Sequence, residues 1–176
     1  MDFPVTTWRR DESAVFCKVA DQYGALSNMA GGYPILINDV AIRTSEALYQ
    51  AMRFPDRPDV QKLIIEQKSP MAAKMVTKPY LEATRPDWND VRVLIMAWAI
   101  RVKLHQNAWF GNMLAETGKR PIVELSHKDD FWGALARGDT LIGRNVLGLL
   151  LTDLRDHPAE PKAPLDDMYL YGDRVA

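Results

Sequence analysis

The sequence has one cysteine, few histidines and no long apolar run, and each of these absences argues against one class of protein. Cys17 alone cannot form an internal disulfide framework, which suits a reducing compartment. The three histidines are scattered without zinc-ligand spacing, so we predict no metal site and no cofactor. No stretch approaches the roughly 18 apolar residues of a membrane span, and the N-terminal residues have no signal-peptide core. We therefore expect a cytoplasmic location without membrane contact.

Several nucleotide and hydrolase motifs are also missing. The sequence contains no phosphate loop, no Gly-x-Gly-x-x-Gly and no Gly-x-Ser-x-Gly. Its net charge of −1 argues against a broad basic surface, so any contact with nucleic acid should be a small local site. A metal-free hydrolase that uses carboxylates is the simplest enzyme class left.

The composition and periodicity of the 176 residues predict an α+β fold in a single, helix-dominated domain with a few short strands. We divide the chain into an N-terminal extension at 1–13, a domain at 14–156 and an extended C-terminal tail at 157–176. Short strands are predicted at 14–19, 33–42 (a strand pair or one bent strand) and 122–125. Helices are predicted at 44–54, 58–67, 69–75, 87–105, 108–117 and 145–155.

The helix at 44–54 carries the first candidate site. Glu46, Tyr49, Gln50 and Arg53 are spaced so that they share one helix face. Such a face forms either a polar site or, more commonly, a solvated surface on which Glu46 complements the helix dipole. The dipole favours the ionised carboxylate, so Glu46 is better suited to act as a base or as a stabiliser of positive charge than as a proton donor.

Two further segments combine polar and aromatic residues. Asp129 precedes Trp132, whose indole can stack on a planar base, although a core tryptophan after a polar turn is the commoner case. Arg144 and Asn145 stand at a helix start, where they can hold a phosphate or simply form a turn and an N-cap.

The remaining candidates lie in a loop and on a short helix. Ser27 and Asn28 form a polar pair that a turn explains equally well. Lys74 and Lys78 are most often solvated, with phosphate binding as a minority role.

Taken together, these segments resemble the NADAR family. The matching pieces occur in the family's order: Tyr23-Gly24, Ser27-Asn28, Thr44-Ser45-Glu46, Gln50-Ala51, Arg53-Phe54, Ser69-Pro70-Met71, Arg85, Asp87-Trp88, Lys103, Glu124, Asp129, Phe131-Trp132-Gly133, Asn145 and Leu147-Gly148.

The resemblance implies hydrolysis of an N-glycosidic bond between a ribose C1 and an exocyclic base amine. One branch of the family acts on early riboflavin-pathway intermediates, and another removes ADP-ribose from guanine in DNA, reversing an ADP-ribosyltransferase toxin. Ala47 replaces a histidine common in the riboflavin branch, and residues 134–139, taken as a loop, lack its glycine-dense stretch. Residues 31–34 and 69–75 look more like the guanine branch. We therefore expect ADP-ribosylated guanine in single-stranded DNA, or a nucleoside or nucleotide, as substrate, and a cognate ADP-ribosyltransferase toxin as possible partner.

The hypothesised mechanism places Glu46 at the anomeric carbon and Asp129 at the ribose hydroxyls or the leaving amine, as the two catalytic carboxylates. Substrate contacts are expected from Ser27, Asn28, Tyr49, Gln50, Arg53, Lys74, Trp132, Arg144 and Asn145. The alternatives are a riboflavin-intermediate hydrolase, a module that binds ADP-ribose or a nucleotide without cleaving it, and a partner-binding domain that uses its tail.

Overall fold

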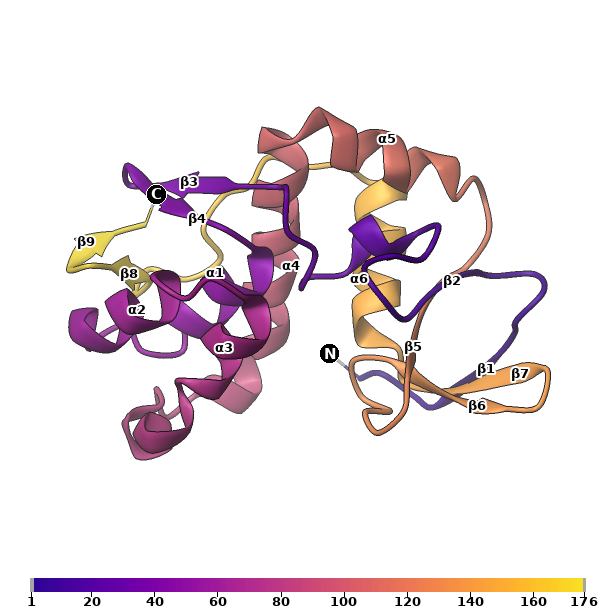
Figure 1. Cartoon of the computed structure of the whole chain (residues 1–176), viewed down its shortest axis with the longest axis horizontal. Helices are drawn as coiled ribbons and strands as arrows, with labels where there is room; N and C mark the ends of the chain where they lie inside the picture. Colours follow the sequence, from indigo (N-terminus) through magenta and orange to yellow (C-terminus); the bar gives the residue numbers. More distant parts are fainter. Residues whose placement is uncertain (1, 176) are drawn as a thin grey trace. The chain divides into compact units, whose positions relative to one another are not determined.

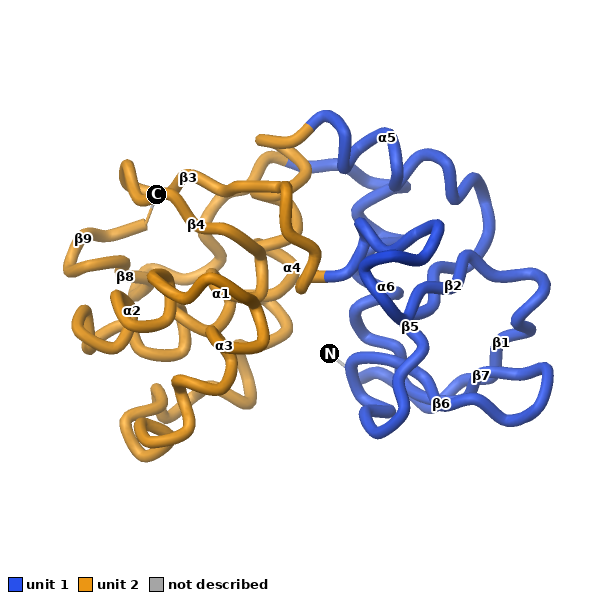
Figure 2. The backbone as a smooth tube through the Cα atoms, in the orientation of Figure 1, with its two compact units in different colours: residues 1–27, 108–159 blue, residues 28–107, 160–176 orange. Residues whose placement is uncertain are grey.

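The computed structural model describes residues 2–175, which form two compact units. Unit 1 comprises residues 1–27 and 108–159, and unit 2 comprises residues 28–107 and 160–176, as Figure 2 shows in blue and orange. Each unit therefore needs two segments that are distant in the sequence. The predicted α+β class, with more helix than strand, is confirmed. Among the described residues, no helix is both long and apolar enough to cross a membrane.

Unit 1 is built on a five-stranded sheet with the order β1-β7-β6-β5-β2 (Figure 1). Its elements are β1 (Thr6–Arg9), β2 (Ala14–Phe16), η1 (Gly24–Leu26), α5 (Ala108–Glu116), β5 (Ile122–Ser126), β6 (Ala134–Arg137), β7 (Thr140–Gly143) and α6 (Val146–Asp156). Strands β2, β5 and β6 are parallel neighbours, whereas β7 runs antiparallel to both β6 and β1. Buried Val123, Ala134 and Leu141 form a small core on this sheet.

The helix α6 approaches β5 very closely at Gly148. A Cβ on Gly148 would lie 2.1 Å from the carbonyl oxygen of Ile122, which no side chain tolerates. The glycine therefore lets the helix backbone rest against the strand, and this contact fixes the position at which α6 begins.

The segment at 134–139, predicted as a loop, is instead the hairpin of β6 and β7. Arg137 pairs with Thr140 across the turn, and Gly138 takes the positive φ of 59° that the turn needs. Ala134-Leu135-Ala136 is a poor strand sequence by intrinsic preference, so its strand state depends on pairing with β5 and β7.

Strand β1 lies in the segment that the sequence suggested was an N-terminal extension. Thr6 to Arg9 pair with β7 along its full length, although most of the strand is exposed. An exposed edge strand has no apolar alternation, which is why the pattern of the sequence did not reveal it.

Unit 2 contains most of the helices. It comprises β3 (Ile35–Ile37), β4 (Val40–Ile42), α1 (Ser45–Ala51), α2 (Pro58–Ile65), α3 (Pro70–Met75), η2 (Lys78–Ala83), α4 (Trp88–Gln106), β8 (Tyr169–Leu170) and β9 (Asp173–Arg174). The predicted strand pair is confirmed as the β3–β4 hairpin, which turns through Asn38 and Asp39 with positive φ. Helices α1 to α4 confirm the four predictions for this region, with ends that differ by a few residues.

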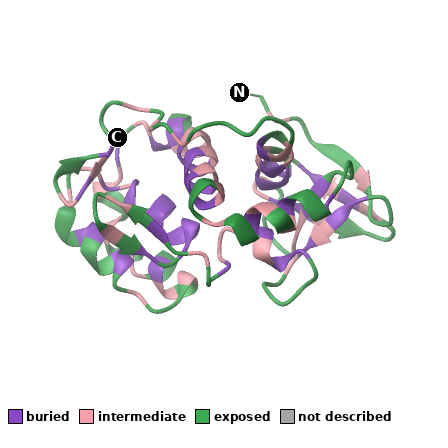
Figure 3. Cartoon of the chain, turned by 90° about the horizontal axis from the view of Figure 1, so that it is seen from above, coloured by how far each residue is buried: buried purple, intermediate pink, exposed green. Residues whose placement is uncertain are grey.

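Local signals explain where these helices begin. The Thr44 side chain accepts a hydrogen bond from the amide of Ala47, 3.1 Å away, and Ser69 does the same for Ala72 at 3.1 Å. The predicted apolar stripe of α4 is confirmed, since Trp88, Ile95 and Trp98 are all buried. Figure 3 colours the chain by burial, with buried positions in purple and exposed positions in green.

The C-terminal tail, predicted as extended, forms the short hairpin of β8 and β9 and packs onto its own unit. Met168, Leu170 and Val175 are buried, and the fully buried amide of Gln61 in α2 holds the tail backbone. Its Nε2 donates to the carbonyl of Tyr169 at 2.7 Å, and its Oε1 accepts from the amide of Tyr171 at 2.8 Å. The tail therefore belongs to the packed structure of unit 2.

Replacing Gln61 with alanine should destabilise the protein by about 2–4 kcal/mol, because two backbone groups of the tail lose their partner in the interior. Denaturant unfolding measures this loss, and limited proteolysis should show earlier cleavage after residue 157. Gln67→Ala is the matched control, since Gln67 donates only to an exposed helix carbonyl. Equal stability of the two variants would show that Gln61 does not hold the tail.

Candidate active site

The N-terminus of α1 and the loop before β3 are tied together at Asn28. The carbonyl oxygen of Asn28 accepts from the backbone amide of Glu46 at 3.0 Å and from the hydroxyl of Ser45 at 3.1 Å. These two bonds fix the Asn28 backbone against the first turn of α1. Its side chain consequently lies beside the Glu46 carboxylate.

The Glu46 carboxylate is buried and clamped by two amides. Only 4% of the residue is exposed, and Gln50 Nε2 donates to Oε1 at 2.9 Å. Asn28 Nδ2 donates to the other oxygen, Oε2. Each carboxylate oxygen thus receives one neutral donor, and among the described residues neither oxygen forms an ion pair.

Burial raises the pKa of Glu46, because leaving water penalises the charged form. Hydrogen bonds from Gln50 and Asn28 and the positive charge of Lys74 act in the opposite direction. We expected the helix dipole to favour the ionised form. The structure shows that desolvation outweighs these stabilising influences, so Glu46 holds a proton more readily than a solvated glutamate does.

Gln50 contributes a second feature to this site. The residue is 5% exposed, and its Oε1 has no hydrogen-bond partner among the described residues. A buried acceptor of this kind is costly unless something donates to it. A hydroxyl or amino group of a substrate beside Glu46 would satisfy it.

Tyr49 and Arg53 complete the predicted helix face. The Tyr49 ring is buried and lies 4.9 Å from the ring of Trp88, centroid to centroid. Arg53 Nε donates to Thr84 Oγ1 at 2.9 Å, and its guanidinium lies 5.5 Å from the Trp88 ring. Three of the four predicted residues are buried and Arg53 is half-buried, so this face is not a solvated surface.

Lys74 lies on α3, which contacts α1. The side chain is exposed, yet its charge lowers the pKa of Glu46. The structure therefore brings together Asn28, Glu46 and Gln50 in direct contact, with Lys74 near enough to influence the carboxylate.

The residues predicted in unit 1 form a separate turn. The Asp129 Oδ1 accepts from the backbone amides of Phe131 at 3.0 Å and Trp132 at 2.9 Å. Its own amide donates to Ser126 Oγ at 3.0 Å. The Trp132 ring is half-buried and meets the Phe131 ring edge-on at 5.2 Å. Asp129 thus shapes the turn that presents Trp132.

Asn145 is wholly buried and joins α6 to β5. Its Nδ2 donates to the carbonyl of Ile122 at 2.8 Å, and its Oδ1 accepts from the amide of Glu124 at 3.0 Å. Its backbone has a positive φ of 49°, which asparagine tolerates better than most residues. Both polar groups of the side chain are therefore engaged in holding the fold.

Arg144 and Ser27 complete the predicted set. Arg144 is exposed, and its Nη1 donates to the carbonyl of Phe3 at 3.4 Å. Ser27 is buried at the end of η1 and directly precedes Asn28 in the chain.

Lys103 in α4 is a polar feature to which we assigned no role from the sequence. It is 1% exposed, and its Nζ lies 4.7 Å from the centre of the Tyr33 ring. Burial lowers the pKa of Lys103 to about 7. The signal was present in the sequence, because Met96, Ala99 and Ile100 place an apolar helix face around position 103.

This lowered pKa predicts a pH-dependent stability. Between about pH 7 and the ordinary lysine pKa of 10.5, the unfolded chain binds a proton at Lys103 and the folded chain does not. Stability from this group should therefore rise with pH in that window, by up to about 1.4 kcal/mol per pH unit. Lys103→Met should be more stable than the wild type at pH 7, and its free energy of unfolding should not rise with pH in this window. Urea unfolding at several pH values measures both effects. Lys62→Met, at an exposed position, should keep the wild-type slope. Identical slopes for all three proteins would contradict the lowered pKa of the buried Lys103 amine.

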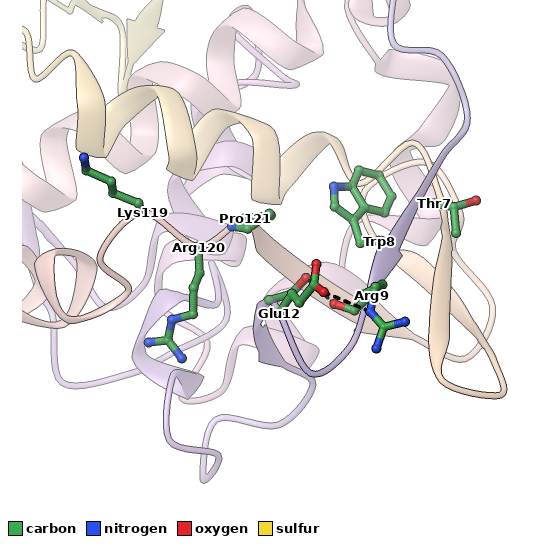
Figure 4. A pocket seen from close by; sticks show the side chains of 8 residues that line it. Thr7, Trp8, Arg9, Glu12, Lys119, Arg120 and Pro121 are labelled. Atoms are coloured by element: carbon green, nitrogen blue, oxygen red, sulfur yellow. Dashed lines mark hydrogen bonds and ion pairs between the residues drawn. The ribbon is translucent and has the colours of Figure 1, made fainter.

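A shallow cavity of about 490 Å³ lies within unit 1, lined by Thr7, Trp8, Arg9, Glu12, Ser13, Lys119, Arg120 and Pro121. Arg9 is neutralised by Asp11 at 2.8 Å and Glu12 at 3.0 Å. In Figure 4, Lys119 and Arg120 extend away from Trp8 in different directions. No residue of the predicted site lines this cavity.

Among the described residues, no group of three or more His, Cys, Asp or Glu side chains is arranged to hold a metal ion. Cys17 Sγ lies 4.0 Å from His127 Nε2. The Glu46 carboxylate is contacted by the side-chain amides of Asn28 and Gln50, and the Lys74 ammonium lies near enough to influence it.

The family model described as "NADAR domain" matches residues 15–157. The chain belongs to the NADAR family. The match covers most of the chain and ends before the tail hairpin of unit 2.

Individual NADAR proteins show how far the similarity extends. The Escherichia coli protein named N-glycosidase YbiA is 32% identical over 150 residues, which cover 84% of this chain and 89% of that protein. The NMR structure of E. coli YbiA matches with a TM-score of 0.70 and 33% identity, covering 84% of each chain. The Vibrio vulnificus protein named Riboflavin biosynthesis protein VVA0006 is 32% identical over 152 residues, which cover 85% of this chain but 40% of that protein. This NADAR chain thus spans less than half of the VVA0006 length.

Proposed function

We propose that this NADAR protein is an N-glycosidase, a hydrolase that cleaves the bond between a ribose C1 and an exocyclic base amine. The buried Glu46 carboxylate, held by Asn28 and Gln50, carries the proposal. Two NADAR relatives named N-glycosidases, YbiA and Npun_R5314 of Nostoc punctiforme, support the reaction class. A module that only binds ADP-ribose has no need of a buried carboxylate, which repels an anionic ligand.

Positive charge develops on the ribose as the C1–N bond breaks, and an anion beside it lowers the barrier. Glu46 would stabilise this charge and accept a proton from the attacking water. The water oxygen bonds to C1, the C1–N electron pair leaves with the amine, and the amine takes up a proton. The raised pKa of Glu46 suits this role, because proton acceptance becomes easier.

The other predicted residues receive roles in binding. Gln50 Oε1 would accept a hydrogen bond from a ribose hydroxyl or the leaving amine, and Arg53 and Lys74 would contact phosphate.

Asp129 would act on the ribose or the leaving amine, and Trp132 would stack on the base. Arg144 would hold phosphate, while the side chain of Asn145 would support the turn rather than the ligand.

The finer proposal is that the substrate is ADP-ribosylated guanine in single-stranded DNA, with an ADP-ribosyltransferase toxin as the source of the modification. Residues 31–34 and 69–75 favour it, since they look like the guanine branch of the family. A small site cannot read a base within a duplex, so the guanine would be presented unpaired or flipped.

A second candidate substrate is a ribosylamino-pyrimidine intermediate of riboflavin biosynthesis. The names of two relatives favour it: Riboflavin biosynthesis protein VVA0006 and, from Zea mays, Riboflavin biosynthesis protein PYRR, chloroplastic. Both candidate substrates contain a ribose C1 bonded to an exocyclic amine, so one carboxylate site serves either.

The test compares hydrolysis of a guanine-ADP-ribosylated oligonucleotide with hydrolysis of the riboflavin intermediate, at equal enzyme concentration. We expect the oligonucleotide to have a kcat/KM at least about tenfold higher, and Glu46→Gln to be inactive on both. The reverse ratio would establish the second candidate. Binding of ADP-ribose without cleavage of either compound would overturn the N-glycosidase proposal.

A further inference from the structure

We propose that one exposed surface of unit 2 binds the single-stranded nucleic acid that flanks the target nucleotide. This surface, called the α3 surface, consists of Lys68, Met71, Lys74, Met75, Lys78 and Leu81 on α3, η2 and the turn before α3. The inference rests on the proposed nucleic acid substrate. It adds a binding site for the strand to the proposed cleavage of the modified base.

The apolar part of the α3 surface is unusually exposed. Met71 and Met75 stand one helical turn apart with 57% and 46% of their surface accessible, and Leu81 is 48% accessible. Thioether side chains are polarisable and contact flat aromatic rings well. Unpaired bases expose such flat faces, whereas a duplex buries them in its stack.

The charged side chains of the α3 surface are all positive. Residues 67–81 contain three lysines and no aspartate or glutamate, in a chain whose net charge is −1. Lys68, Lys74 and Lys78 are all exposed. Three ammonium groups around exposed methionines complement a strand that carries one phosphate per nucleotide.

The α3 surface lies next to the candidate carboxylate. Helix α3 contacts α1, and the charge of Lys74 lowers the pKa of Glu46. Lys74 stands between Met71 and Met75 in the sequence and shares their helix face. When the modified base of a nucleic acid strand reaches Glu46, the neighbouring nucleotides therefore lie over this helix face.

Binding is measured by fluorescence anisotropy with a labelled, unmodified oligonucleotide of mixed sequence. Lys68→Glu/Lys78→Glu should weaken binding at least about tenfold and reduce the salt slope of log K by about 1.4, at 0.7 per lost contact. Met71→Ser/Met75→Ser should weaken it without changing that slope. The control Lys119→Glu/Lys162→Glu removes the same charge from exposed positions elsewhere and should bind as the wild type does.

Four competitors define the partner. We expect single-stranded DNA and RNA of equal sequence to compete, and duplex DNA and an acidic peptide to compete at least about tenfold less well. Equal competition by the acidic peptide or the duplex would overturn the proposal, since the surface would then recognise charge alone. Equal affinity of the wild type and Lys68→Glu/Lys78→Glu would overturn it as well. Circular dichroism and thermal unfolding confirm that each exposed variant is folded.

Kinetics separate this inference from the proposed function. For an ADP-ribosylated oligonucleotide, Lys68→Glu/Lys78→Glu should raise KM at least about tenfold, and for ADP-ribosylated guanosine it should leave KM unchanged. If neither compound is cleaved while the variant still loses oligonucleotide binding, the proposed function fails and the α3 surface stands. If both compounds are cleaved with unchanged KM by the variant, the α3 surface is overturned and the proposed function stands.

Discussion

Glu46→Gln should lower kcat by about 100- to 10,000-fold, the usual effect of removing a positioned acid–base group. Substrate affinity should change little, because the amide keeps the shape of the carboxylate. The Asn28 and Gln50 side chains can rotate their amides to remain hydrogen-bonded, since Gln50 Oε1 has no partner among the described residues. Single-turnover and steady-state kinetics on the preferred substrate measure the effect.

The same variant should be at least as stable as the wild type, with a defined pH dependence. The pKa of Glu46 is raised in the folded state. The stability that its protonated carboxyl group contributes is therefore fully present at pH values below the pKa of Glu46 in the unfolded chain. That contribution is lost as pH rises through the folded pKa. The free energy of unfolding of Glu46→Gln should therefore exceed that of the wild type increasingly as pH rises above about 4.5, the ordinary value for glutamate.

Glu66→Gln is the matched control, since Glu66 is an exposed carboxylate at the end of α2. It should retain wild-type kcat and wild-type pH dependence of stability. If Glu46→Gln retains more than about a tenth of the wild-type rate, Glu46 is not the catalytic carboxylate.

Asn145→Ala should destabilise the protein by about 3–5 kcal/mol, which is among the largest effects of a single side chain. The change removes the hydrogen bonds that the Asn145 side chain makes to the carbonyl of Ile122 and to the amide of Glu124. It also places alanine at a φ of 49°, a region that favours asparagine or glycine. Urea unfolding monitored by tryptophan fluorescence measures the loss.

Asn145→Gly separates the two causes. Glycine accepts the positive φ without strain but cannot make the hydrogen bonds, so it should recover only the backbone part of the loss. In the folded fraction of either variant, KM should stay within a few-fold of the wild-type value. A large rise in KM with unchanged stability would instead assign Asn145 to the ligand.

Much of the secondary structure was predictable, because its causes are local. Thr44 and the Ser69-Pro70 pair indicate where two helices begin. The apolar stripe from Trp88 to Val102 identifies the longest helix. The hairpin at 35–42 followed from β-branched residues around Asn38-Asp39. These signals act over a few residues and depend little on the rest of the chain.

Strands β1 and β6–β7 and the tail hairpin were not predictable in this way. Residues 134–137 have weak strand preference and form a strand because β5 and β7 supply hydrogen bonds on both sides. The tail is fixed by Gln61, which lies more than a hundred residues earlier in the chain. Their conformations depend on partners that a local pattern does not contain.

The sequence by itself determined the family, the helix that carries Glu46, and the set of polar residues worth testing. Only the tertiary structure decided that Glu46 is buried between Asn28 and Gln50, and that Asn145 serves the fold. The physical reason is that the pKa of a carboxylate and the partners of an amide are set by the surrounding chain. Helical spacing places side chains on one face, but desolvation depends on what covers that face.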